Sequence, residues 1–276
     1  MSLVLPHTHL VSSSAFPELL KTWRRKRQLS QLALALECGV SQRHVSFLES
    51  GRAKPSRDMI MQLSDTLNVP LRDRNDWFVA AGFAPIFRTT ALDDPQMAQV
   101  MSAVRMMLAN HAPFPAVAVD RAWNIRFTNT PFERLLSLLD ENTWAGIGGA
   151  QRNLMRLFFH PRGIRPYVAN WKSIAPLLWQ RACREAEAIG SQDMRDVLTE
   201  LRVLQRYEAL IAVTVSDAVL LPVLPLIIEK DGVRASLFTV IATFGTAQDV
   251  TTDELRIESM FPADPATEEL FTSMVP

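Results

Sequence analysis

Apolar residues recur with helical spacing along the first third of the chain. Between residues 16 and 85 this periodicity predicts five helices separated by short turns. The inward-facing positions are Phe16, Leu20, Leu34, Ala35, Val45, Leu48, Ile60, Leu63, Leu67, Trp77 and Phe78. An apolar side on each of five helices favours an all-α bundle with its own core. Residues 1–15 are small and polar and are expected to form a flexible arm.

The segment at residues 29–55 has the layout of two short helices joined by a tight turn. Ser30 and Ser41 stand where the two helices need N-cap residues, and Gly39 supplies the left-handed backbone that the turn requires. In a DNA-binding helix-turn-helix, the second of two such helices enters the major groove. The pattern therefore predicts a DNA-binding unit over residues 16–85.

The pattern changes after the turn-forming residues at 93–95. A helix over residues 97–110 is expected first, and its apolar stripe consists of Val100, Val104, Met107 and Leu108. The stretch PAVAVDRAWNIRFTN then alternates apolar and other residues on either side of a turn, which predicts a β-hairpin. Asn129 is placed to cap the helix that follows. Strand, turn, strand and capped helix is the opening of a PAS-like sensor domain.

Helices return and then give way to strands. Three helices are expected between residues 153 and 207. A strand from Val219 and another strand follow, joined by the hairpin turn Lys230-Asp231-Gly232. The mixture predicts an α+β, PAS-like domain over residues 93–276.

The net charge of the 276 residues is zero, but the charges are unevenly distributed. Residues 17–75 carry eleven Lys or Arg and six Asp or Glu, whereas residues 76–276 carry eighteen and twenty-three. The basic excess, including the run from Lys21 to Arg27, falls on the unit expected to bind DNA. We expect a cytoplasmic protein that does not enter membranes, because the sequence shows neither a secretory leader nor a sufficiently long apolar stretch.

The remaining candidate chemistry gives no indication of an enzyme. Cys38 and Cys183 are too few for a disulfide framework, and the pair His7 and His9 lacks further metal ligands nearby. The glycine-rich piece at residues 146–149 lacks the spacing and the Lys-Ser/Thr of a phosphate loop. We therefore expect no catalytic site, no metal and no cofactor.

The stretch LSQLALALECGVSQRHVSFLESGRAKPS resembles the Xre/Cro/cI family of helix-turn-helix regulators, and the resemblance extends over residues 17–83. It implies that double-stranded DNA is a partner and that a homodimer binds two half-sites. The residues implied to contact bases are Gln42, Arg43, Ser46 and Phe47. Those expected to contact phosphates are Gln31, Ser41, Arg52, Lys54 and Arg25. Gln31 would also brace Gln42. Glutamine suits adenine and arginine suits guanine. Leu32 and Ala33 stand where this family often has acidic residues, so the capping box is missing.

Beyond residue 93 the chain resembles the MmyB-like class of regulators. The residues that carry this resemblance are NLMRLFFHP, the long helices and the closing SLFTVIATFGTAQDVTTDELRIESMFPAD. In that class a helix-turn-helix precedes a PAS-like ligand-binding domain that is associated with fatty acids. The resemblance implies a bound fatty acid.

An apolar ligand needs a pocket with apolar walls. The candidate wall residues are Phe127, Phe132, Leu154, Leu157, Phe158, Trp171, Leu178, Phe238, Ile241 and Phe244. Each of them is also explained as ordinary core. Asn153 and Arg156 are candidates to bind a ligand carboxylate, and pairing of Arg156 with a protein carboxylate is the alternative. Two further alternatives stay open: the domain serves only dimerisation, or it senses a metabolite that is not a lipid.

Overall fold

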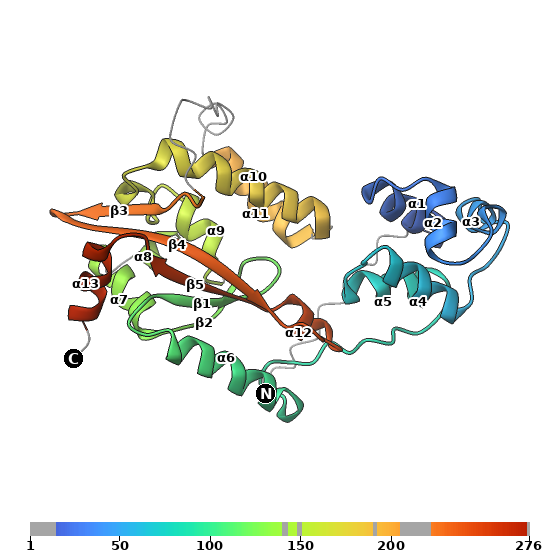
Figure 1. The fold of residues 1–276 in the computed structure, drawn as a ribbon, viewed down its shortest axis with the longest axis horizontal. Coiled ribbons are helices and arrows are strands. Elements are labelled where there is room, and N and C mark those ends of the chain that lie inside the picture. The colour runs from blue at the N-terminus through green and yellow to red at the C-terminus, as the bar shows by residue number, and fades with distance from the viewer. Residues whose placement is uncertain (1–14, 140–142, 148–150, 190–191, 205–221, 275–276) are drawn as a thin grey trace. The chain divides into compact units, whose positions relative to one another are not determined.

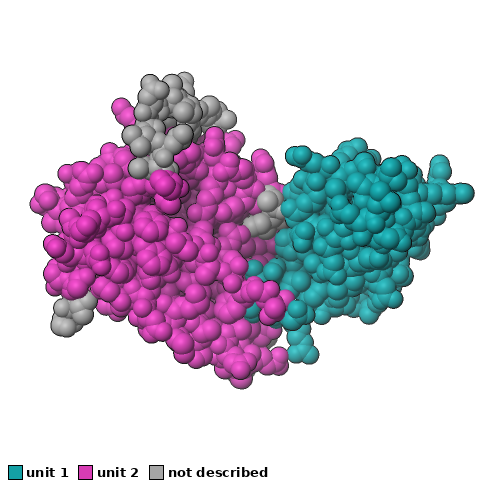
Figure 2. All heavy atoms as spheres, viewed as in Figure 1, with its two compact units in different colours: residues 1–89, 248–253 teal, residues 90–247, 254–276 magenta. Residues whose placement is uncertain are grey.

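The computed structural model describes residues 15–139, 143–147, 151–189, 192–204 and 222–274. They form two compact units, shown in different colours in Figure 2. Unit 1 comprises residues 1–89 and 248–253, and unit 2 comprises residues 90–247 and 254–276. The sequence-based boundaries of 16–85 and 93–276 differ from this division, because a short segment near the C-terminus belongs to unit 1. Several predicted features lie outside the described residues: most of the N-terminal arm with His7 and His9, Gly148 and Gly149, and the strand start at Val219.

Unit 1 is the predicted helical bundle. Its helices are α1 (Phe16–Lys26), α2 (Gln31–Glu37), α3 (Gln42–Glu49), α4 (Arg57–Thr66) and α5 (Leu71–Ala80). The hydroxyls of Ser30 and Ser41 each accept a hydrogen bond from the backbone N–H three residues along, which confirms their role as N-caps, and Ser56 caps α4 in the same way. Gly39 has a φ of 62°, as the turn requires. All eleven predicted core positions are buried.

Residues 248–253 complete unit 1 from a distant part of the sequence. They include most of the short helix α12 (Val250–Glu254). The backbone N–H of Val250 donates to the carbonyl of Arg88 at 2.8 Å. The carboxylate of Asp253 accepts a hydrogen bond of 3.2 Å from the N–H of Leu71, the first residue of α5. The residue before α5 is Pro70, which has no side-chain group to offer, so Asp253 supplies the missing cap.

Unit 2 is built on one antiparallel sheet of five strands in the order β2-β1-β5-β4-β3 (Figure 1). The strands are β1 (Ala116–Val119), β2 (Ile125–Thr128), β3 (Leu226–Lys230), β4 (Val233–Thr243) and β5 (Arg256–Pro262). The helices are η1 (Pro95–Met97), α6 (Ala98–Asn110), α7 (Thr130–Leu139), α8 (Thr143–Ile147), α9 (Leu154–Phe159), η2 (Arg165–Tyr167), α10 (Trp171–Ile189), α11 (Gln192–Leu204) and α13 (Pro265–Ser273). This architecture confirms the predicted α+β, PAS-like domain.

Helices cover both faces of the sheet (Figure 1), which explains why every residue of β1 is apolar. Val117 and Val119 belong to the large core shared with α9, α10 and α11, whereas Ala116 and Ala118 belong to the cluster with α6. All four residues are buried. Small residues on one face allow α6 to pack closely against the strand, and branched residues fill the space on the other.

The structure differs from the sequence-based expectation at three places. The buried stripe of α6 contains Met101, and Met107, which was assigned to it, is exposed. The first strand of the last hairpin begins at Leu226, because Pro225 directly before it cannot donate a hydrogen bond to a sheet. The strand β5 was not expected at all, although it lies at the centre of the sheet.

Asn129 caps α7 as predicted and has further hydrogen-bond partners. Its side-chain oxygen accepts hydrogen bonds from the N–H groups of Phe132 and Ala116. Its amide nitrogen donates to the carbonyls of Leu108 and Phe114. One buried side chain therefore joins α6, β1 and α7, which closes the first hairpin against the helices on either side of it in sequence.

Candidate DNA interface and ligand pocket

The surface of α3 has the distribution that a recognition helix needs. Val45 and Leu48 are fully buried, whereas Gln42 and Arg43 are exposed near its N-terminus. The long polar side chains of the exposed pair can reach base edges in a major groove. Ser46 and Phe47 lie half-buried.

Phe47 contacts two cations that come from different parts of the motif. The guanidinium of Arg43 lies 5.1 Å from the centre of its ring, and that of Arg52 lies 5.9 Å away. The backbone N–H of Arg52 also donates to the carbonyl of Phe47 at 2.9 Å. The aromatic ring therefore restrains two side chains that were predicted to contact DNA, one a base and the other a phosphate.

The predicted phosphate-contacting residues have different surroundings. Arg25, Arg52 and Lys54 are exposed. The hydroxyl of Ser41 is occupied as an N-cap by the N–H of His44. Gln31 does not brace Gln42: its amide donates to the carboxylate of Glu49 at 2.7 Å. The reason is that Glu49 is buried and needs donors.

Two arginines of the basic run at residues 21–27 form hydrogen bonds inside unit 1. Arg24 donates two hydrogen bonds to Glu49, at 2.6 and 2.9 Å. Arg27 donates to the carbonyls of Leu67 and Asn68, each at 2.7 Å. Burial alone would raise the pKa of the Glu49 carboxyl, but the hydrogen bonds from Arg24 and Gln31 lower it overall. The run therefore supplies fewer cations to a DNA surface than its sequence implies.

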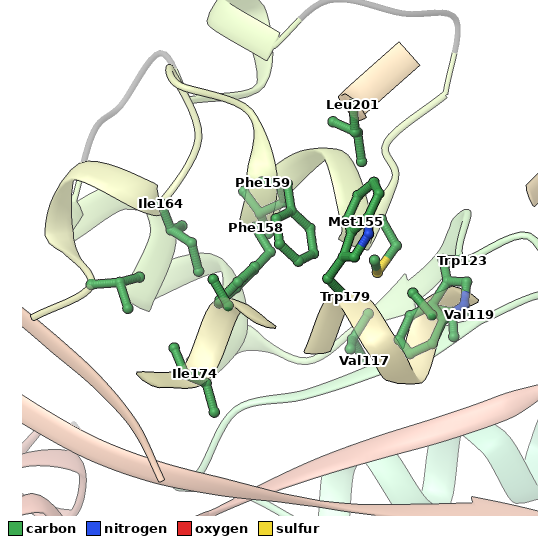
Figure 3. Packing of buried hydrophobic residues seen from close by; sticks show 14 of the residues in the cluster. Val117, Val119, Trp123, Met155, Phe158, Phe159, Ile164, Ile174, Trp179 and Leu201 are labelled. Atoms are coloured by element: carbon green, nitrogen blue, oxygen red, sulfur yellow. The ribbon is translucent and has the colours of Figure 1, made fainter. Parts of the chain in front are cut away.

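Unit 2 contains an apolar cavity of about 220 Å³ between the sheet and the helices α7, α9 and α10. Figure 3 shows the side chains that pack around this part of the core, among them Met155, Phe158 and Ile174. The polar side chains of its lining are Arg181, Thr239 and Glu258. A cavity with apolar walls and a few polar groups is suited to a largely apolar ligand that carries one polar group.

The predicted wall residues divide into two sets. Those that line the cavity are Phe132, Leu154, Leu157, Phe158, Leu178 and Phe238. Those outside its lining are Phe127, Trp171, Ile241 and Phe244. Phe127 and Phe244 belong to the cluster with α6 on the opposite face of the sheet, and Trp171 stacks on Phe158 at 5.2 Å. Helical or strand spacing alone does not show which face of a fully covered sheet a residue occupies.

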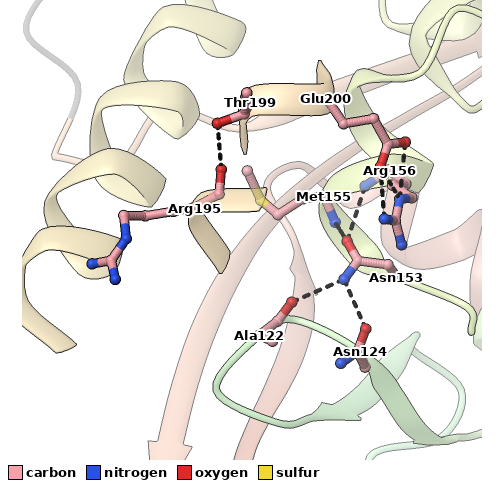
Figure 4. Close-up of polar contacts among 8 residues, drawn as sticks. All are labelled: Ala122, Asn124, Asn153, Met155, Arg156, Arg195, Thr199 and Glu200. Atoms are coloured by element: carbon pink, nitrogen blue, oxygen red, sulfur yellow. Dashed lines mark hydrogen bonds and ion pairs between the residues drawn. The ribbon is translucent and has the colours of Figure 1, made fainter. Parts of the chain in front are cut away.

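Asn153 and Arg156, the expected carboxylate-binding pair, do not line the cavity and have partners within the protein (Figure 4). Asn153 caps α9 by accepting from the N–H groups of Met155 and Arg156, and it donates to the carbonyl of Ala122 at 2.9 Å. Arg156 forms an ion pair with Glu200 at 2.7 Å, which is the alternative that the sequence left open.

The polar corner of the cavity instead involves α10 and β5. The guanidinium of Arg181 lies 2.8 Å from the carboxylate of Glu185 and 3.4 Å from that of Glu258. Arg256 donates a second hydrogen bond to Glu185, at 2.8 Å. Burial raises the pKa of the Glu258 carboxyl to about 7, although the arginines act in the opposite direction. Sequence reasoning missed Glu258 because the strand that carries it was not expected.

Within the described residues, no three His, Cys, Asp or Glu side chains are placed to hold a metal ion. Among the helices that the structure describes, none combines the length and the apolar character that a membrane span requires.

Comparison with known families gives a match for each unit. A family described as "MmyB-like transcription regulator ligand binding domain" matches residues 100–274, and a helix-turn-helix family matches residues 20–73. The first match covers the sheet and the cavity, and the second covers the recognition helix. No curated protein matches the chain.

Proposed function

We propose, from the premise that the chain belongs to the family of MmyB-like transcription regulators, that unit 2 binds a fatty acid and that this binding alters DNA binding by unit 1. The chain is a DNA-binding transcription regulator with a ligand-binding domain. We propose no catalytic role for either unit.

The observation that carries the fatty-acid proposal is the composition of the cavity wall. All lining residues are apolar except Arg181, Thr239 and Glu258. Burial of apolar ligand surface in such a wall contributes roughly 25 cal/mol per Å². A hydrocarbon chain therefore gains affinity from the wall, while a single polar head is accommodated by the three polar residues.

The chain itself links the cavity to the DNA-binding unit. Thr239 of β4 and Glu258 of β5 line the cavity, and residues 248–253 between these strands belong to unit 1. A ligand that favours one arrangement of the two strands can therefore shift the conformational population of the segment that caps α5. This connection supports the proposal that DNA affinity depends on the ligand.

The proposed DNA contacts follow the exposure of α3 and of the segment after it. Gln42 and Arg43 contact base edges, with Ser46 and Phe47 beside them, and Arg52 and Lys54 contact phosphates. Two copies of the chain bind two half-sites about one helical turn apart, as a homodimer. A protein with this activity is expected in the cytoplasm, where the DNA is.

The test begins with the purified full-length protein. Denaturation, extraction with organic solvent and mass spectrometry of the extract should give a fatty acid at about one per chain. Adding the same acid to the delipidated protein should then change its affinity for operator DNA. A stoichiometric compound of another class would overturn the lipid assignment.

An empty extract calls for a second measurement. If dodecanoic acid then neither binds the protein nor changes its DNA affinity, ligand sensing by a fatty acid is overturned. Light scattering of unit-2 surface variants would in that case examine dimerisation as the remaining role of the domain.

A further inference from the structure

We propose that Arg181 binds the carboxylate head of the ligand beside a protonated Glu258, so that the cavity selects a monoanionic amphiphile over a neutral one of equal length. This inference rests on the proposed function, because it assigns the residues that recognise the head group in the same cavity. It also predicts that Glu258 carries a proton when the ligand is bound.

The polar lining residues gather at one place in the sheet. Thr239 of β4 pairs with Met260 of β5, and Glu258 precedes Met260 by two residues. Cross-strand partners and residues two apart share one face of a sheet, so Thr239 and Glu258 lie on the same face. Arg181 approaches that face from α10. The rest of the lining is apolar, so this corner is where the head of an amphiphile would lie.

The contacts of Arg181 leave room for another acceptor. Its Nε donates to Glu185 at 2.8 Å, whereas its Nη2 lies 3.4 Å from Glu258, at the long limit of a hydrogen bond. Among the described residues, Nη1 has no acceptor. A guanidinium offers five N–H donors in a planar arrangement that matches a carboxylate.

A second donor in this corner also lacks a partner. The guanidinium of Arg181 lies 5.0 Å from the centre of the Trp123 ring, which lines the cavity. The Nε1–H of Trp123 is buried and has no hydrogen-bond acceptor among the described residues. Buried N–H donors normally have a hydrogen-bond acceptor, so an anionic ligand group near these two side chains would supply the missing acceptor.

The local charge explains why the ligand should be anionic. The groups that face Glu258 are Arg181 and Glu185 from α10 and Arg256 from its own strand. Its cross-strand partners, Val117 of β1 and Ile241 of β4, do not titrate. With Glu258 ionised the two arginines and two carboxylates sum to zero, and with Glu258 protonated they leave one positive charge. One carboxylate from the ligand then restores neutrality.

The sign of the pH dependence follows from this balance. Burial places the pKa of Glu258 at about 7, so below that pH the cluster carries its extra positive charge. Above that pH, Glu258 must take up a proton for the anion to bind. Affinity for an anionic ligand therefore falls as the pH rises above about 7, by at most about tenfold per pH unit.

The test compares dodecanoic acid with dodecanol, titrated into the delipidated full-length protein between pH 6 and 8.5 and followed by tryptophan fluorescence. The native protein should prefer the acid at pH 6, and this preference should fall by up to about 30-fold at pH 8.5, because the protonated fraction of Glu258 falls by about that factor. Arg181→Gln should weaken acid binding about 10- to 100-fold and leave alcohol binding nearly unchanged. Glu258→Gln should retain acid binding and remove its pH dependence. Arg184→Gln, on an exposed position of the same helix, is the matched control.

The outcomes separate this inference from the proposed function. If both compounds bind but Arg181→Gln weakens them equally, or if Glu258→Gln keeps the native pH dependence, the head-group assignment is overturned and fatty-acid binding stands. If neither compound binds, both proposals fail. Should Arg181→Gln lose its fold by circular dichroism, the double variant Arg181→Gln/Glu258→Gln removes the buried charge and is titrated instead.

Discussion

Arg24 and Glu49 form an ion pair through two hydrogen bonds, of 2.6 and 2.9 Å, that joins α1 to the end of the recognition helix α3. Arg24 also donates to the carbonyl of Leu29, and Gln31 at the start of α2 donates to Glu49. The three helices are therefore held by one buried carboxylate. The angle at which α3 presents Gln42 and Arg43 depends on this group.

Replacing Arg24 with Gln should destabilise unit 1 by about 3–5 kcal/mol, because it removes one partner of a buried charge pair. Hydrogen–deuterium exchange of peptides from α1, α2 and α3 measures the effect within the full-length protein. Arg25→Gln changes the exposed neighbour and should leave exchange unchanged. The pH adds a second check. Because folding lowers the pKa of Glu49, this carboxylate stabilises the native unit 1 at pH values above its unfolded pKa, and the stabilisation is lost as the pH falls. Equal exchange in the two variants would contradict the structural role of the pair.

Arg43→Ala should reduce discrimination at one base pair by about 1–3 kcal/mol. The reason is that Arg43 is exposed near the N-terminus of α3 and is restrained by the ring of Phe47. Competition binding with operator variants and with random DNA measures the difference. An equal loss of affinity on specific and random DNA would reassign Arg43 to a phosphate.

Arg52→Gln should weaken binding to every DNA sequence alike. A phosphate contact contributes about one unit to the slope of the logarithm of affinity against the logarithm of salt concentration, so the slope should fall by about that amount. Binding is measured between low and moderate salt on one operator and one random duplex. Arg184→Gln, an exposed arginine of unit 2, should not alter the slope. A slope unchanged by Arg52→Gln would remove this residue from the DNA interface.

Glu258→Gln should change how the stability of unit 2 depends on pH. The folded pKa of Glu258, about 7, is above the usual carboxyl value of 4.5. The contribution of Glu258 to the free energy of unfolding is therefore fully present below pH 4.5 and is lost as the pH rises to 7. Over that interval the native protein should lose on the order of 3 kcal/mol relative to the variant. Exchange of the β1, β4 and β5 peptides from pH 4.5 to 7.5 follows this loss. A constant difference between the two proteins would show that Glu258 has an ordinary pKa.

Gly163→Ala should destabilise unit 2 by about 3 kcal/mol, because a Cβ there would lie 2.1 Å from the carbonyl oxygen of Leu157. That oxygen already accepts from the N–H of Ile164 at 2.9 Å, so the backbone after α9 would have to move. Thermal unfolding of the variant is compared with that of Gly245→Ala, whose added Cβ meets nothing within 4 Å. Similar midpoints for the two variants would contradict the close approach.

The helices of unit 1 could be predicted because their determinants are local. Ser30, Gly39 and Ser41 specify two helix starts and a turn within a few residues of one another, and the apolar spacing places Val45 and Leu48 inward. The Arg24–Glu49 pair could not be predicted in this way, because it spans 25 positions and each residue alone resembles an exposed charge.

The residues around the cavity could be predicted less well, because their positions depend on packing between distant parts of the chain. Its walls come from a sheet covered on both faces, and a residue such as Phe127 shows the same alternation whichever face it occupies. Strand β5 carries Arg256, Glu258 and Ser259 among its apolar residues, so no apolar alternation marked it as a central strand. The sequence left two partners open for Arg156, a ligand carboxylate or a protein carboxylate, and could not name Glu200, which is its partner from 44 residues away.

The insertion of residues 248–253 into unit 1 means that the polypeptide passes between the units three times rather than once. An N-terminal fragment ending at residue 89 would lack the carboxylate that caps α5 and the N–H that bonds the carbonyl of Arg88. A deletion of the connection between β4 and β5 would remove the same groups while leaving the five helices in the chain. The two units are thus distinct in their cores but interlaced in the order of the sequence, and neither can be excised as one continuous stretch.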